Sequence, residues 1–107
     1  MFAQAFVYGK LGPVSIGSLR IDFRLGGCRS LKEKRQRLAG MRERFGRMPN
    51  LAVFESDHHD VLNRAQWTFV AGAASAQVAE QLLAGIERDV QELVDAEVVD
   101  IRREWLD

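Results

Sequence analysis

The chain has one cysteine, no net charge and no long apolar run, and each of these shortages excludes a class of protein. Cys28 has no second cysteine with which to form an intramolecular disulfide, so we expect a reducing compartment. No stretch approaches the ~20 apolar residues that span a bilayer, and residues 1–13 show no signal-peptide pattern. We therefore expect a cytoplasmic protein without a membrane partner. The balance of 15 basic and 15 acidic residues also argues against a generally basic nucleic-acid binder.

What is present is the composition of an ordinary globular protein, with 47% hydrophobic and 28% charged residues. A chain of 107 residues is long enough to bury a core without metal or disulfide staples. The charges are unevenly placed, because residues 29–47 hold eight Lys or Arg and two acids, whereas residues 80–97 hold six acids and one Arg. Either the basic segment faces an anionic partner, or the two segments lie together and offset one another.

Hydrophobic periodicity divides the chain into six elements. Residues 14–25 end in strict alternation, with Leu19, Ile21 and Phe23 on one side, which predicts a half-buried strand. A helix is expected over residues 31–47, and a second helix after the N-cap candidate Ser75, with a stripe made of Val78, Leu82, Ile86, Val90 and Leu93. The remaining strands are expected over residues 51–56, 64–73 and 97–106, the last with Val99, Ile101 and Trp105 alternating.

The order strand-helix-strand-strand-helix-strand predicts an α+β fold, the ferredoxin-like βαββαβ sandwich. In this fold a four-stranded antiparallel sheet carries both helices on one face and leaves the other face open to a ligand or a second copy. We expect residues 14–107 to form this single domain. Residues 1–13 lie outside the plan as an N-terminal extension that could form an added strand.

The start of the first helix, Arg29–Arg35, departs from the usual electrostatic rule. Ser30 and Glu33 have the spacing of a capping box, in which each side chain binds a free backbone N–H group of the first turn. The first turn normally prefers acids, because it carries the positive end of the helix dipole. Basic residues crowd it here. The candidate anion- or RNA-binding residues are Arg29, Ser30, Lys32, Lys34 and Arg35.

Lys34 also falls in the middle of the apolar stripe formed by Leu31, Leu38, Met41 and Phe45. A core-facing ammonium must reach water or find an acid, because burying it unpaired is expensive. The acids at the end of the next strand, Glu55 and Asp57, are the expected ion-pair partners. A structural ion pair of this kind is preferred to a working site around Lys34.

The sequence Asp57-His58-His59-Asp60 is a candidate metal site, since imidazole and carboxylate suit several divalent ions. Neighbouring side chains diverge, so no more than two of these four residues easily share a metal. Glu55, Asp57 and His59 are the weak candidate ligands, and a plain polar loop is the preferred interpretation. We expect no cofactor, and no Cys-His pairing supports catalysis by Cys28.

The run Arg29-Ser30-Leu31-Lys32-Glu33-Lys34-Arg35, followed by Glu55-Ser56-Asp57, Arg64-Ala65 and Val98-Val99-Asp100, resembles the YlxP-like family of small bacterial proteins, a domain of unknown function (number 503). The resemblance covers about residues 15–106 and implies a ferredoxin-like fold. No enzymatic activity is established for that family. The family's genes often lie beside genes for translation and ribosome maturation, which associates it with RNA. The N-terminal extension and His58-His59 depart from the family pattern.

The leading functional hypothesis is a non-enzymatic cytoplasmic module that binds RNA or a ribosome-associated partner through the basic helix start. The alternative is a protein-interaction module, including a homodimer formed through the open sheet face or a sheet edge. A weaker alternative is a small metal-dependent hydrolase centred on Glu55, Asp57 and His59. RNA binding should weaken steeply with salt, whereas association through apolar surface should not.

Overall fold

The computed structural model describes residues 14–106, and its six elements follow the predicted order. The extension over residues 1–13, with its predicted added strand, lies outside the described residues. The elements are β1 (Ser15–Arg24), α2 (Leu31–Phe45), β2 (Leu51–Asp57), β3 (Arg64–Ala73), α3 (Ala76–Leu93) and β4 (Glu97–Trp105). None of the helices in the described range combines the length and apolarity needed to cross a bilayer.

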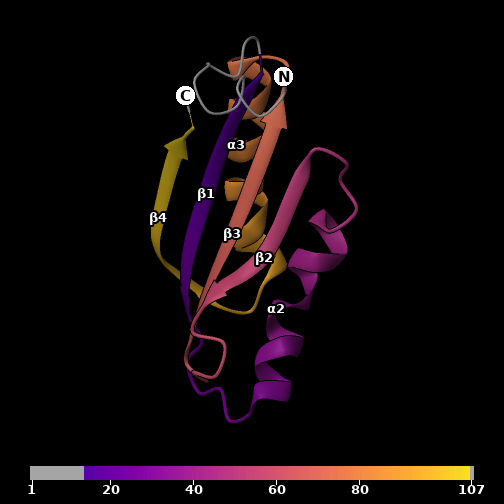
Figure 1. Ribbon diagram of the computed structural model, residues 1–107. Helices are drawn as coiled ribbons and strands as arrows, with labels where there is room; N and C mark the ends of the chain where they lie inside the picture. Colours follow the sequence, from indigo (N-terminus) through magenta and orange to yellow (C-terminus); the bar gives the residue numbers. More distant parts are fainter. Residues whose placement is uncertain (1–13, 107) are drawn as a thin grey trace, which may run out of the picture.

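The four strands form one antiparallel sheet in the order β2-β3-β1-β4, so β1 and β3 are central and β2 and β4 are edges (Figure 1). Helix α3 packs against β1 and β3, while α2 lies against β2. Both helices contribute side chains to one core on the same face of the sheet. The ferredoxin-like α+β prediction is confirmed.

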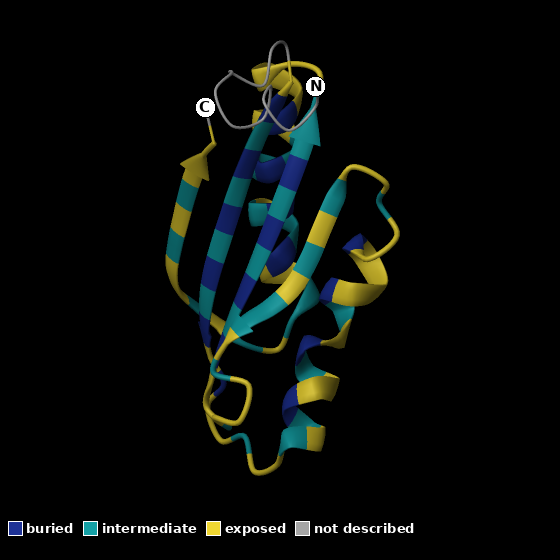
Figure 2. Cartoon of the chain, in the orientation of Figure 1, coloured by how far each residue is buried: buried dark blue, intermediate teal, exposed yellow. Residues whose placement is uncertain are grey.

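Alternation in the two central strands explains which face the helices cover. Leu19, Ile21 and Phe23 of β1 are fully buried, as is Phe69 of β3, and the residues between them are half-buried on the other face. Buried and intermediate bands accordingly alternate along β1 and β3 (Figure 2). The period of two therefore fixes both the sheet and the face on which its core lies.

Helix α2 begins where its cap predicts but ends before residue 47. The Ser30 hydroxyl accepts a hydrogen bond from the Glu33 backbone N–H at 3.0 Å. The reciprocal half of the capping box is not seen in the described residues, because the Glu33 carboxylate lies 3.5 Å from Arg37. The helix ends at Phe45, and Gly46 donates the last helical hydrogen bond to Arg42 O at 2.9 Å.

The predicted stripe of α3 is wrong at Val78 and off-centre at Leu82, which packs against the core while only partly buried. Ala79 and Leu83 are buried in this part of the helix, whereas Val78 is 50% exposed. The reason is geometric: with 3.6 residues per turn, repeated steps of four drift by about 40° each. Val78 therefore lies about 120° from Val90 around the axis, while Ala79 lies within about 20° of it.

Strand β4 also departs from simple alternation. A bulge opposite Asp22 and Phe23 shifts the register, so that Phe23 pairs with Val98 and Ile21 pairs with Ile101. Val98 and Ile101 pack against the core, and Val99 is left 40% exposed as the extra residue. The predicted inward position of Val99 is wrong. One inserted residue in a strand moves the side chains on one side of the bulge to the opposite face of the sheet.

Candidate nucleic-acid interface

The helix start places four of its five candidate residues at the surface. Arg29, Ser30, Lys32 and Arg35 are exposed, and Ser30 is already engaged as the cap of α2. The fifth, Lys34, turns inward and is only 3% exposed. The cations at the beginning of α2 thus divide into three that face solvent and one that belongs to the interior.

Lys34 holds the loop between β2 and β3. Its ammonium donates hydrogen bonds to the backbone oxygens of His58 at 2.6 Å and Val61 at 2.9 Å, with His59 O further away at 3.4 Å. The Glu55 carboxylate lies 3.1 Å from the same nitrogen. Glu55 Oε2 nevertheless accepts no well-directed hydrogen bond within the described residues. The Glu55 carboxylate therefore acts as a counter-charge, while the three backbone carbonyls accept the hydrogen bonds of the ammonium.

The structure thus brings Lys34 and Glu55 together and leaves Asp57 out of the contact. Asp57 Oδ1 instead accepts the backbone N–H of His58 at 2.7 Å, which supports the turn in which His58 has a φ of 63°. With all its donors directed at the loop, Lys34 has none left for an anion. We therefore assign it to the architecture of the loop rather than to a binding surface.

The three weak metal candidates are not gathered around a common point. The Glu55 carboxylate faces Lys34, and the Asp57 carboxylate accepts a hydrogen bond from the backbone N–H of His58. His59 Nε2 lies 3.1 Å from the backbone oxygen of Glu55. Within residues 14–106, no three His, Cys, Asp or Glu side chains are placed to share a metal ion. A metal-dependent reaction would need ligands that this loop does not assemble.

The arginines on the α3-facing side of α2 are paired with acids. Arg37 lies 3.4 Å from Asp95 and also donates to the backbone oxygens of Asp95 at 2.7 Å and Gly26 at 2.9 Å. Arg44 lies 3.6 Å from Asp89 of α3. On this side the acidic segment offsets the basic one, as one of the two interpretations of the charge pattern predicts.

The opposite side of α2, together with the turn that follows its last residue, carries the cations that we call the β2-side cations: Lys32, Arg35, Arg42 and Arg47. All four are exposed. None has a carboxylate oxygen within 4.0 Å among the residues that the structure describes. The first three follow helical spacings of three and seven residues, so they lie on one side of α2. On the α3-facing side the basic residues are offset by acids, whereas on the opposite side they are left available to an anionic partner.

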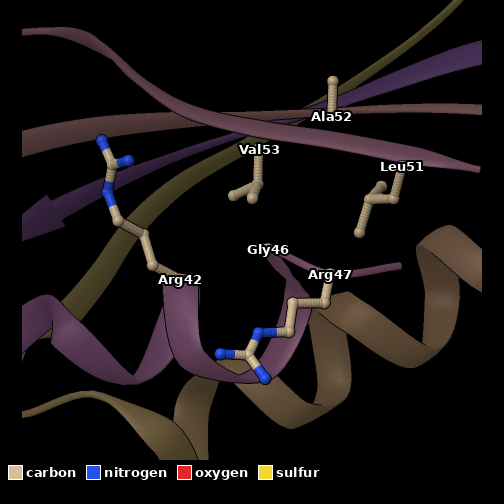
Figure 3. Close-up of a pocket in the computed structure, with 6 residues that line it drawn as sticks. All are labelled: Arg42, Gly46, Arg47, Leu51, Ala52 and Val53. Atoms are coloured by element: carbon tan, nitrogen blue, oxygen red, sulfur yellow. The ribbon is translucent and has the colours of Figure 1, made fainter. Parts of the chain in front are cut away.

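Two hollows lie between α2 and the edge of the sheet, and Arg42 lines both. The first, of about 440 Å³, is bounded by Arg42 and Arg47, with Leu51 and Val53 pointing into it from β2 and Ala52 pointing away (Figure 3). The second, of about 560 Å³, lies between α2 and the β2–β3 loop and reaches down to Trp67. We call the second hollow the Trp67 groove.

The open face of the sheet is polar over its centre. Gln66 donates to Asp22 at 3.1 Å and accepts from Ser56 at 2.9 Å, and Ser56 in turn accepts from Thr68 at 2.7 Å. Phe54 is exposed on this face, at 43%, where it is paired with Thr68 across the strands. One aromatic residue at the edge does not make the row of stacking side chains by which an RNA-recognition sheet holds bases.

Comparison with models of protein families finds a match over most of the chain. A family model described as "Protein of unknown function (DUF503)" matches residues 16–103. A search of curated proteins finds no match to the chain.

Proposed function

The chain belongs to the DUF503 family of proteins of unknown function, and we propose that it binds RNA through the β2-side cations of α2. The observation that carries this proposal is the contrast between the two sides of one helix. Arg37 and Arg44 are neutralised by neighbouring acids, whereas the β2-side cations keep their charge available to an outside partner. The proposal assumes a cytoplasmic protein and no catalytic step.

The β2-side cations form a row whose length suits contact with a nucleic-acid backbone. Lys32 and Arg42 are ten residues apart in α2, which corresponds to about 15 Å along the axis at 1.5 Å per residue. Each strand of a DNA duplex rises about 3.4 Å per phosphate, and an unstacked strand spaces its phosphates more widely, so this length reaches more than one phosphate. Arg47, just beyond the end of α2, extends the row along β2.

The physical signature of such binding is its dependence on salt. Four phosphate contacts release about four counterions, which gives a slope of log affinity against log salt of about −2.8 to −3.6. Affinity should then fall about 50- to 150-fold between 50 and 200 mM salt.

The test is a charge reversal at the helix start, Lys32→Glu with Arg35→Glu, measured by filter binding to RNA and by co-sedimentation with ribosomes. We expect affinity to fall at least tenfold and the salt slope to drop by about two. The thermal midpoint should hardly move, since exposed charges contribute little to stability. The control reverses Arg88 and Arg102, which are exposed on other elements and carry the same total charge. Equal affinity in the two double variants would refute the proposal.

Self-association through the open face or a sheet edge stays a prediction. The surface of the described residues favours it less than it favours RNA binding. The free edge at β2 carries an inward-facing Glu55 and a bulge between Glu55 and Asp57. Inward charges and bulges at edges both oppose pairing with another strand. The open face offers the polar network of Gln66, Ser56 and Thr68 rather than a continuous apolar surface.

A further inference from the structure

We propose that the RNA partner is single-stranded and that one unstacked base enters the Trp67 groove while the β2-side cations hold its phosphates. This inference rests on the proposed function and specifies its substrate. The groove adjoins the cation row directly, because Arg35 and Arg42 belong to both. A strand that follows the row therefore passes the mouth of the groove.

The interior of the groove suits a planar heterocycle. Leu31, Leu38 and Ala39 of α2 give it an apolar wall, and Trp67 of β3 lines it from the sheet. Its volume of about 560 Å³ falls within the range of roughly 300–1,000 Å³ that is typical of small-ligand pockets. Charged and polar side chains make up the rest of the lining, among them Glu43, Glu55, His59 and Asp60. A base fits such a lining, since its faces are apolar and its edges are polar.

Trp67 supplies a second, independent indication of a ligand. The residue is 5% exposed, and its indole Nε1 has no hydrogen-bond partner within residues 14–106. A buried donor left without an acceptor is unfavourable. Carbonyl oxygens and ring nitrogens on the edges of bases are acceptors of the kind that this N–H lacks.

Arg42 completes the arrangement by covering the indole. Its guanidinium carbon lies 5.3 Å from the centroid of the Trp67 ring. A guanidinium is planar and stacks on bases as well as on aromatic side chains. The indole nitrogen is buried, so the base reaches it only when the exposed Arg42 side chain moves from the indole onto the face of the base. A base that is paired and stacked in a duplex has both its faces and its Watson–Crick edge occupied, so the groove selects single strands.

The experiment separates the planar shape of Arg42 from its charge. In a Trp105→Phe background Trp67 is the single tryptophan of the chain, so its fluorescence reports on the groove. A single-stranded RNA 12-mer of mixed sequence and the same strand annealed to its complement are titrated against this protein, Arg42→Lys and Arg42→Ala. Arg44→Lys and Arg44→Ala serve as matched controls on the α3-facing side. Thermal midpoints verify that every variant is folded.

We expect the single strand to quench Trp67 and to bind about tenfold more tightly than the duplex, as one stacked base allows. Arg42→Lys should lose that advantage and the quenching, although it keeps its charge. The Arg44 variants should stay within twofold of the parent. Equal binding of both RNAs, or an Arg42→Lys variant indistinguishable from the parent, would overturn the inference and leave the proposed function standing. Absence of binding to either RNA would overturn both.

Discussion

Replacement of the buried Lys34 by methionine is expected to destabilise the fold strongly. Methionine keeps the buried stem but removes an ammonium that meets Glu55 at 3.1 Å and donates to His58 O and Val61 O. Removing one partner of a buried pair costs about 3–5 kcal/mol, because the remaining charge is left uncompensated. For a domain of this size, at about 4 °C per kcal/mol, the thermal midpoint should fall by about 12–20 °C.

Thermal unfolding followed by circular dichroism measures this loss, and hydrogen exchange over residues 58–61 locates it in the loop. Lys32→Met is the matched control, since Lys32 is exposed and should stay within about 0.5 kcal/mol of the parent. Lys34→Met combined with Glu55→Leu removes both charges and should be more stable than Lys34→Met alone. If Lys34→Met unfolds within about 2 °C of Lys32→Met, the ammonium does not hold the loop and the reasoning fails.

Two further predictions concern glycine and capping. Gly40→Ala should lower the free energy of unfolding by about 1–3 kcal/mol, because a Cβ there would lie 2.7 Å from the Leu93 carbonyl oxygen. Gly85→Ala has only a flexible side chain within contact distance, at 3.5 Å, and should raise it by about 0.5–1 kcal/mol; equal urea midpoints for the two variants would contradict this. Ser75→Ala removes the acceptor of the Val78 N–H at 3.2 Å and should cost about 1 kcal/mol in urea unfolding, whereas a loss below about 0.3 kcal/mol would mean that water caps α3 equally well.

The sheet could be predicted from sequence because its central strands are covered by helices on one face and exposed on the other. That asymmetry produces the alternation of Leu19, Ile21 and Phe23 with polar residues. Pattern alone does not fix the rotation of α3 about its axis, because Val78 and Ala79 are both apolar. The β4 bulge could not be predicted, since Val98 and Val99 are the same residue type.

The site shows a similar division. An acid at the end of β2, Glu55 or Asp57, could be predicted as the neighbour of Lys34, because a buried ammonium requires an acid, and the structure selects Glu55. The carbonyls of His58 and Val61 could not, because every residue has a backbone oxygen and the sequence does not say which ones converge. The grouping of Arg35 with Arg42, opposite Arg37 and Arg44, follows from helical spacing. Which of the two sides meets acids depends on the position of α3, and the contact of Arg42 with Trp67 depends on that of β3.

The way in which Lys34 binds the β2–β3 loop sets the kind of change that this loop tolerates. The ammonium contacts backbone oxygens, at His58 and Val61, and these oxygens are present whatever the side chains are. Substitution along the loop therefore leaves the anchor intact, provided that position 58 accepts its φ of 63°. An insertion or deletion would displace the oxygens from the ammonium. The loop is thus free to vary in residue type but fixed in length, which makes it a natural place to exchange side chains at the mouth of the Trp67 groove.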